Sequence, residues 1–139
     1  MIQSFHASCV AFGARGLLIR GASGSGKSSL ALAMMARGAA LIADDVTRLA
    51  VRNGQLVATC PPQGRGLIEA RNMGILRTAR VQDQTILALV ADLDDVETER
   101  LPVARHCDIL GVTLDLVRRI DGPHFADALL CYLEGQRHA

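Results

Sequence analysis

The sequence predicts an α/β fold in which a mixed β-sheet is flanked by helices. A glycine-rich stretch, residues 21–26, lies between a short apolar segment and a segment rich in Ala, Leu and Met. This strand–loop–helix order is typical of a P-loop domain. Asn53-Gly54, flanked by β-forming residues, is a strong hairpin signal, so the sheet cannot be purely parallel. A length of 139 residues suits one domain, residues 1–139.

The N-terminal half alternates apolar segments with glycines. Residues 4–12 and 17–19 predict two strands separated by a turn at residues 13–16. Residues 27–37 lack β-branched side chains and predict a helix, with Gly38 at its C-terminal cap. Residues 40–43 predict a buried strand that ends at Asp44-Asp45.

The C-terminal half is patterned less sharply. Residues 46–52 and 55–59 predict the strands of the hairpin, and residues 85–90 predict a further strand. The glycine-spaced residues 64–74 predict an ordered loop, and residues 101–117 fit no single pattern. Asp121-Gly122-Pro123 precedes a final amphipathic helix.

The composition excludes several classes of protein. The net charge is +1 with no block of like charge, and the aromatic residues are three Phe and one Tyr, which disfavours nucleic-acid binding. No export signal and no run of about 20 apolar residues is present, so we expect a cytoplasmic protein that does not span a membrane. None of the four cysteines has a C-x-x-C spacing, so we expect reduced thiols rather than a zinc site.

The strongest motif is G-x-x-x-x-G-K-[ST], which the sequence matches at every required position. Its glycines allow successive N–H groups to point at phosphate oxygens, its lysine reaches the β- and γ-phosphates, and its final hydroxyl suits Mg²⁺. The motif predicts binding of a nucleoside triphosphate such as ATP. Its residues are Gly21, Ala22, Ser23, Gly24, Ser25, Gly26, Lys27 and Ser28.

Lys27 is the only lysine, and every other Lys/Arg position in the chain is an arginine. A compact ammonium is needed among phosphates, whereas arginine is tolerated elsewhere. A single lysine also leaves no room for the N-K-x-D motif by which GTPases read guanine. The nucleotide preference and the reaction stay open.

Other polar residues are candidates for catalysis, and each has a simpler interpretation. Asp44 and Asp45 follow a buried strand, where one acid could hold Mg²⁺ and the other accept a proton, unless they only form a solvated turn. His6 is otherwise an exposed strand histidine, Glu69 an ion-pair partner of a nearby arginine, and Arg100 a solvated charge.

Together these residues resemble the catalytic domain of the bacterial HPr kinase/phosphorylase family. The family pattern is a histidine near a strand, then G-x-S-G-x-G-K-S, then R-G-x-x-L-x-A-D-D, then E-x-R-x-x-G-I. The chain has His6, the P-loop, residues 37–45 and residues 69–75 in this order. The resemblance covers residues 4–76 well and thins toward Arg100.

The resemblance implies an ATP- and Mg²⁺-dependent serine kinase with a P-loop kinase fold. It implies that Lys27 contacts phosphate, that Ser28 and Glu69 bind the metal, and that Asp45, or else Asp44, accepts the proton of the substrate serine. It further implies that His6 assists that acid and that a downstream arginine, here Arg100, contacts phosphate. The implied partner is an HPr-like phosphocarrier protein, and the implied assembly is a ring-like homo-oligomer such as a hexamer.

The sequence also departs from the family pattern. Full-length members carry a further N-terminal domain, so the chain resembles a truncated, catalytic-domain-only form. Asn72 replaces a signature glycine, and the P-G-R-N-like loop linked to the phosphorylase reaction has no counterpart, so the kinase direction is favoured. Two other functions stay open: a non-catalytic nucleotide-binding sensor, and a kinase of a small metabolite, for which no arginine-rich lid is evident.

Overall fold

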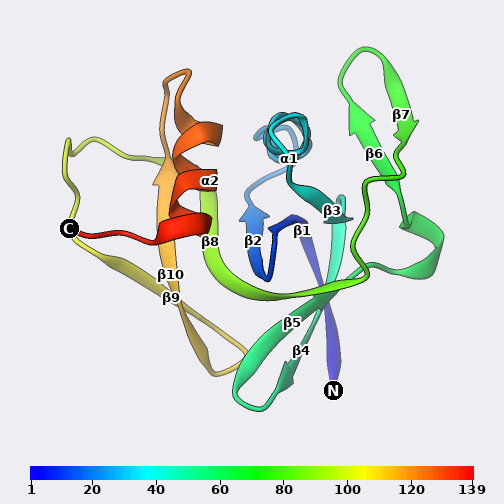
Figure 1. Ribbon diagram of the computed structural model, residues 1–139, viewed down its shortest axis with the longest axis horizontal. Helices are drawn as coiled ribbons and strands as arrows, with labels where there is room; N and C mark the ends of the chain where they lie inside the picture. The colour runs from blue at the N-terminus through cyan, green and yellow to red at the C-terminus, as the bar shows by residue number, and fades with distance from the viewer.

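A mixed sheet of eight strands forms the body of the computed structural model, which describes residues 1–139 (Figure 1). The long strand β1 (Ile2–Phe12) runs antiparallel to β2 (Arg15–Arg20) and, along its N-terminal half, to β4 (Val46–Arg52). The long strand β8 (Gln84–Val96) is parallel to β2. The predicted mixed sheet is therefore confirmed.

Five of these strands close into a ring. The turn at Asn53-Gly54 has φ values of 52° and 76°, as a type I′ turn requires, and leads from β4 into β5 (Gln55–Thr59). β5 pairs with the first residues of β8, and β8 pairs with β2 farther along. The ring order is thus β2, β1, β4, β5, β8.

The remaining elements attach to this ring. The short strand β3 (Ala40–Ala43) pairs with β1, and β10 (Val112–Arg119) pairs with β8 and with β9 (Arg105–Ile109). A separate two-stranded sheet, β6 (Leu67–Ala70) and β7 (Gly74–Arg77), follows the 3₁₀ turn Pro62–Gly64 and projects beside β3 (Figure 1). The helices are α1 (Lys27–Ala36) and α2 (Phe125–Gly135).

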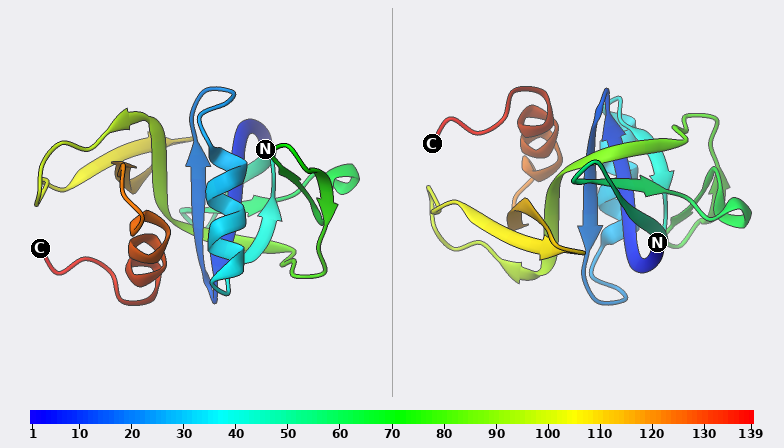
Figure 2. Two further views of the ribbon diagram at one scale, coloured as in Figure 1. Left: turned by 90° about the horizontal axis from the view of Figure 1, so that it is seen from above. Right: turned by 90° about the horizontal axis from the view of Figure 1, so that it is seen from below.

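The alternation of side chains along the strands produces two apolar cores. In β2, Leu17 and Ile19 face a core that α1 and α2 cover, whereas Leu18 faces a second core inside the strand ring. Met34 of α1 and Leu129 of α2 are among the helix residues that fill the first core. Both helices therefore lie over one face, as the two views of Figure 2 show, and no helix residue belongs to the second core.

The structure corrects two sequence-based expectations. Residues 64–74 are not only a loop, because they contain β6 and the first residue of β7, joined by a turn in which Asn72 has a φ of 66°. The strand predicted at 85–90 extends to Val96, because β8 pairs with β10 beyond the reach of β2. The unassigned residues 101–117 contain β9 and most of β10.

The other element boundaries agree with the predictions to within a few residues.

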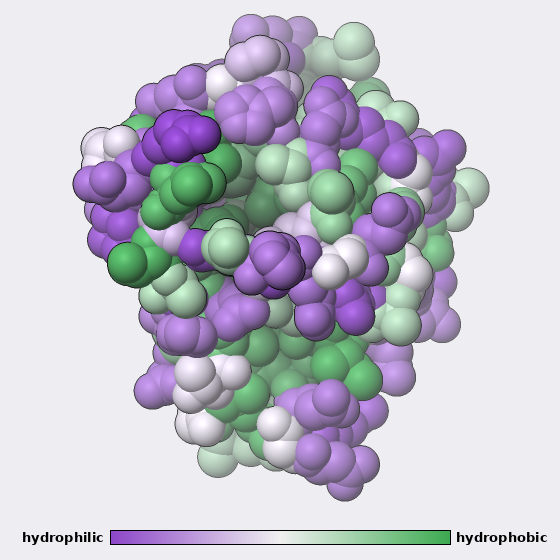
Figure 3. Space-filling view, turned by 60° about the vertical axis from the view of Figure 1, so that its left-hand side comes forward, coloured by the Kyte–Doolittle hydropathy of each residue, from purple (hydrophilic) through white to green (hydrophobic).

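The face of the molecule in Figure 3 has hydrophilic residues along its rim and hydrophobic residues within its hollows. Neither helix is long and apolar enough to cross a membrane. All four cysteines are free thiols, and burial raises the pKa of Cys9.

Candidate active site

The P-loop connects the end of β2 to the first turn of α1. Gly24 and Gly26 have φ values of 83° and 104°, which side chains rarely adopt, so glycine is needed for the backbone to curl. No side chain caps the N-terminus of α1, and no acidic residue lies in its first turn. Its free N–H groups therefore leave a positive helix end available to an anion.

Lys27 is buried with its ammonium inside the loop. The residue is only 6% exposed, and Nζ donates to the carbonyl oxygens of Gly21 at 2.8 Å and Ala22 at 3.1 Å. These two carbonyls accept two of the three N–H donors of the ammonium. A residue of β8 also contacts the start of the P-loop: Oδ1 of Asp94 accepts the N–H of Ala22 at 2.9 Å.

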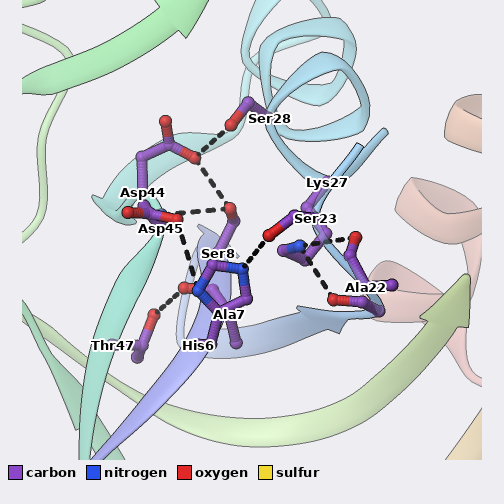
Figure 4. A network of polar contacts seen from close by, with 11 residues as sticks. His6, Ala7, Ser8, Ala22, Ser23, Lys27, Ser28, Asp44, Asp45 and Thr47 are labelled. Carbon is purple, nitrogen blue, oxygen red and sulfur yellow. Dashed lines mark hydrogen bonds and ion pairs between the residues drawn. The ribbon is translucent and has the colours of Figure 1, made fainter. Parts of the chain in front are cut away.

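Asp44 accepts three hydrogen bonds at the end of β3. Oδ1 accepts the hydroxyls of Ser8 and Ser28, each at 2.7 Å (Figure 4). Oδ2 accepts the N–H of Glu69 at 3.0 Å. Three donors and no acceptor around one carboxyl group fit its ionised form. Both oxygens are thus occupied.

Asp45 is placed differently, although it is the next residue. It has a left-handed backbone conformation, with φ at 68°, and its side chain is 70% exposed. Its Oδ1 lies 3.4 Å from Nδ1 of His6, whose Nε2 lies 3.4 Å from the hydroxyl of Ser23 (Figure 4). Asp45 therefore has an oxygen open to solvent and a histidine that orients it.

Lys27, Ser28 and Asp45 line one polar pocket of about 300 Å³, whereas Asp44 lies behind its lining. Cationic and anionic side chains both reach it, and none of the lining residues is hydrophobic. Such a lining suits phosphate groups and a metal ion rather than a nucleobase. The lining residues are His6, Ser23, Gly24, Gly26, Lys27, Ser28, Ser29, Asp45, Glu69 and Arg71.

Comparison with known proteins agrees with this geometry. Residues 1–119 match the family described as "HPr Serine kinase C-terminal domain". The chain belongs to this family. Among curated relatives, the HPr kinase/phosphorylase of Cupriavidus metallidurans is 37% identical over 115 residues, which cover 74% of the chain and 35% of that protein. That of Ralstonia pickettii is 36% identical with the same coverage.

A solved structure is similar over nearly the whole chain. The Hpr(Ser) kinase/phosphatase from Coxiella burnetii matches with a TM-score of 0.81 and 26% identity, covering 97% of the chain and 96% of its own. The chain spans about a third of the length of the curated relatives it matches. The family and the fold expected from the sequence are confirmed.

The HPr kinase family signature lies on the β6–β7 hairpin. Glu69 is exposed in β6 and Arg71 follows in the turn, and both side chains line the pocket. The backbone of Glu69 also donates to Asp44, so the hairpin is tied to the end of β3. The structure thereby brings together His6, Lys27, Ser28, both acids and Glu69.

Some P-loop residues and Arg100 lie outside this lining. Gly21 and Ala22 contact Lys27 through their carbonyls, whereas the Ser25 hydroxyl is buried without a hydrogen-bond partner. Arg100 is exposed in the segment between β8 and β9 and does not line the pocket. The structure therefore does not bring Arg100 to the other candidates.

The donor set fits a magnesium ion bound together with phosphate. No group of three or more His, Cys, Asp or Glu side chains forms a ready-made metal cage. Mg²⁺ usually takes one or two protein oxygens and completes its shell with phosphate oxygens and water. Since Ser28 directs its proton to Asp44, the lone pairs of its oxygen stay free for a cation. Ser28 and the nearby carboxylates would hold the ion.

Sequence reasoning did not name Ser29 and Arg71, which line the pocket, or two further residues that contact the site. Ser8 contacts Asp44 from β1, and Asp94 contacts the P-loop from the end of β8. Ser8 could have been found, because it follows His6 by two residues on the same face of one strand. Asp94 carries no such signal, since only the pairing of β8 with β2 brings it to Ala22.

Proposed function

We propose that the chain is an ATP-dependent protein serine kinase whose substrate is the phosphocarrier HPr or a related protein. The observation that carries the proposal is the unequal placement of the two acids. Asp44 is occupied by three donors, whereas Asp45 opens onto the phosphate pocket beside His6. A protein that only binds nucleotide needs no open proton acceptor at this point.

Each residue has a role in the proposed transfer. Asp45 accepts the proton of the substrate serine, while the serine oxygen forms a bond to the γ-phosphorus and the bond from that phosphorus to the β–γ bridging oxygen breaks. ADP carries away the displaced oxygen. Lys27 leaves the two loop carbonyls to contact the phosphates, and the N-terminus of α1 faces them. Bound Mg²⁺ would neutralise phosphate charge as it develops.

His6 keeps Asp45 in place. A proton on Nδ1 of His6 would face the carboxylate, which leaves Nε2 to accept from Ser23. General-base help of this kind contributes about 10²–10⁴-fold to the rate. Positioning of the serine and electrostatic stabilisation of the phosphate supply the rest of the acceleration.

Labelled ATP, Mg²⁺ and HPr test the proposal directly. We expect phosphoserine in HPr with the unaltered chain, and transfer at least about 10²-fold slower with Asp45→Asn or Lys27→Ala. Tight binding of ATP without transfer would favour a nucleotide sensor instead. Phosphoserine-HPr with inorganic phosphate tests the reverse reaction, which we expect to be weak because no P-G-R-N-like segment is present.

A homo-oligomer in the cytoplasm is part of the same proposal. Met73 and Ile75 on the β6–β7 hairpin are 76% and 66% exposed, and burial against a second copy would remove this apolar surface from water. Light scattering coupled to gel filtration measures the mass. A monomer at all concentrations would contradict this part of the proposal.

A further inference from the structure

Ser8 is a buried hydroxyl residue at the meeting point of the two acids. It is 0% exposed and lies in β1 on the face that carries His6 and Val10, since these residues alternate with Ala7 and Cys9. That face is the one covered by α1, whose first turn carries Ser28. The position accounts for a hydroxyl in an otherwise apolar stretch, because it points to the ionised Asp44.

The contacts of Ser8 reach both acids. Its hydroxyl donates to Oδ1 of Asp44 at 2.7 Å, the oxygen that also accepts from Ser28 (Figure 4). Its own oxygen accepts the N–H of Asp45 through a longer contact of 3.4 Å. The Ser8 side chain therefore links the carboxylate of Asp44 to the backbone of Asp45.

We propose that Ser8 is a positioning residue that orients Asp44 toward Ser28 and thereby prepares Ser28 for a divalent cation. With Oδ1 held by Ser8, the carboxylate stays in line to accept the Ser28 proton, and the Ser28 oxygen presents its lone pairs to the pocket. The contact with Asp45 supports the left-handed turn between the acids. The assignment of Ser28 to the cation rests on the proposed function.

The physical basis is the cost of leaving a carboxylate under-bonded. Without the Ser8 hydroxyl, Oδ1 of Asp44 keeps only Ser28, and the side chain gains freedom to rotate. Residues that orient a metal ligand in this way typically change metal affinity about 10–100-fold when they are replaced. Binding of ATP without a cation does not use Ser28 as a metal ligand, so it depends little on Ser8.

The test compares three variants by calorimetry with ATP alone and with ATP plus Mg²⁺. For Ser8→Ala we expect the binding of Mg²⁺–ATP to weaken about 10-fold or more, while binding of ATP without cation changes less than about 2-fold. Ser8→Thr keeps the hydroxyl and should restore most of the affinity. Thr47→Val is the matched control, because Thr47 is also a buried strand residue but donates to the carbonyl of Ala7.

Thermal unfolding of the same variants separates positioning from stability. We expect Thr47→Val to lower the melting temperature about as much as Ser8→Ala does, without changing the affinity for Mg²⁺–ATP. If Ser8→Ala binds Mg²⁺–ATP as tightly as the unaltered chain, or weakens both forms of ATP equally, Ser8 has no positioning role. Loss of Mg²⁺–ATP affinity in Ser8→Thr as severe as in Ser8→Ala would also contradict the proposal.

Failure of this inference can be told from failure of the proposed kinase activity. Calorimetry requires only that the chain binds nucleotide, whereas the proposed function requires transfer to a protein serine. A cation-specific loss in Ser8→Ala without any transfer by the unaltered chain would support the role of Ser8 and contradict the kinase.

Discussion

Nδ1 of His6 lies 3.4 Å from Oδ1 of Asp45, whereas the neighbouring Asp44 has no contact with that ring and accepts Ser8, Ser28 and the N–H of Glu69 instead. Two adjacent carboxylates therefore have different surroundings. The strand β3 ends just before them, and the left-handed conformation of Asp45 turns its side chain away from that of Asp44. The proposed division of chemical roles follows from this turn: Asp44 orients Ser28 for the metal ion, and Asp45 accepts the proton of the substrate serine.

Exchange of either acid for its amide should give two different defects. Asp45→Asn should lower the rate of transfer to HPr about 10²–10⁴-fold while nucleotide binding is kept, because only the proton acceptor is lost. Asp44→Asn should weaken binding of Mg²⁺–ATP, because an amide cannot accept all three donors. Transfer rates and calorimetry on both variants check this. The reverse pattern would assign the proton acceptor to Asp44.

Replacement of the single lysine should abolish transfer, and arginine should not restore it. Lys27→Ala removes the ammonium that we propose contacts the phosphates, with an expected loss of about 10²–10³-fold or more in kcat. Lys27→Arg keeps the charge but needs more space than the buried loop offers. Arg52→Lys, on the exposed end of β4, is the control for a change of basic residue. Transfer by Lys27→Arg near the unaltered rate would refute this role.

The Glu97–Arg105 ion pair should make stability depend on pH in the acid range. Arg105 donates to both carboxylate oxygens of Glu97 at 3.1 and 3.2 Å, and these bonds lower the pKa of Glu97 to about 2. The ordinary value, 4.5, applies to the unfolded chain, which binds the proton first as the pH falls. The contribution is therefore complete above about pH 4.5 and is lost progressively toward about pH 2.

Urea unfolding at a series of pH values measures this contribution. The difference in unfolding free energy between the unaltered chain and Glu97→Gln should be largest near neutral pH and should vanish as the pH approaches 2. Glu134→Gln, at an exposed position of α2, is the control for the loss of a carboxylate elsewhere on the surface. A constant difference for Glu97→Gln across the range would mean that the ion pair does not shift the titration.

The packing of β2 on β8 should not tolerate a side chain at Gly16. A Cβ there would overlap Cγ2 of Thr85 and lie 3.2 Å from the carbonyl oxygen of Ile86. Gly16→Ala should cost about 1–3 kcal/mol of stability, as overpacking usually does. Thr85→Ala removes the overlapping methyl and a hydroxyl that has no partner, so the double variant should recover much of the loss.

Denaturant unfolding of the two single variants and the double variant gives the unfolding free energies for a double-mutant cycle. Gly135→Ala is the control, because a Cβ at Gly135 meets no atom within 4 Å. Additive effects of Gly16→Ala and Thr85→Ala would show that the two side chains do not compete for space.

The local elements of the fold could be predicted because their signals are local. The hairpin at Asn53-Gly54, the helix after Lys27 and the strand before Asp44 each depend on residues close in sequence. The β6–β7 hairpin was missed because its turn depends on the backbone of Asn72 and Gly74 rather than on a hydrophobic pattern. β9 and β10 were unassigned although exposed and less exposed residues alternate along β9 and the first half of β10. The turn that joins them carries no clear signal, because Leu110 adopts a left-handed conformation, with φ at 51°, that such a side chain rarely has.

The P-loop, its lysine and the two acids after a strand can be predicted from residue types alone, because the chemistry of phosphate binding requires them at a short spacing. Which acid accepts three hydrogen bonds and which is open to the pocket depends on the folded chain. That choice depends on Ser8 from β1, Ser28 from α1 and Glu69 from β6, which are far apart in the chain. Pairing of β1 with β3 and docking of the β6–β7 hairpin bring them together, since a hydrogen bond requires its partners within about 3 Å.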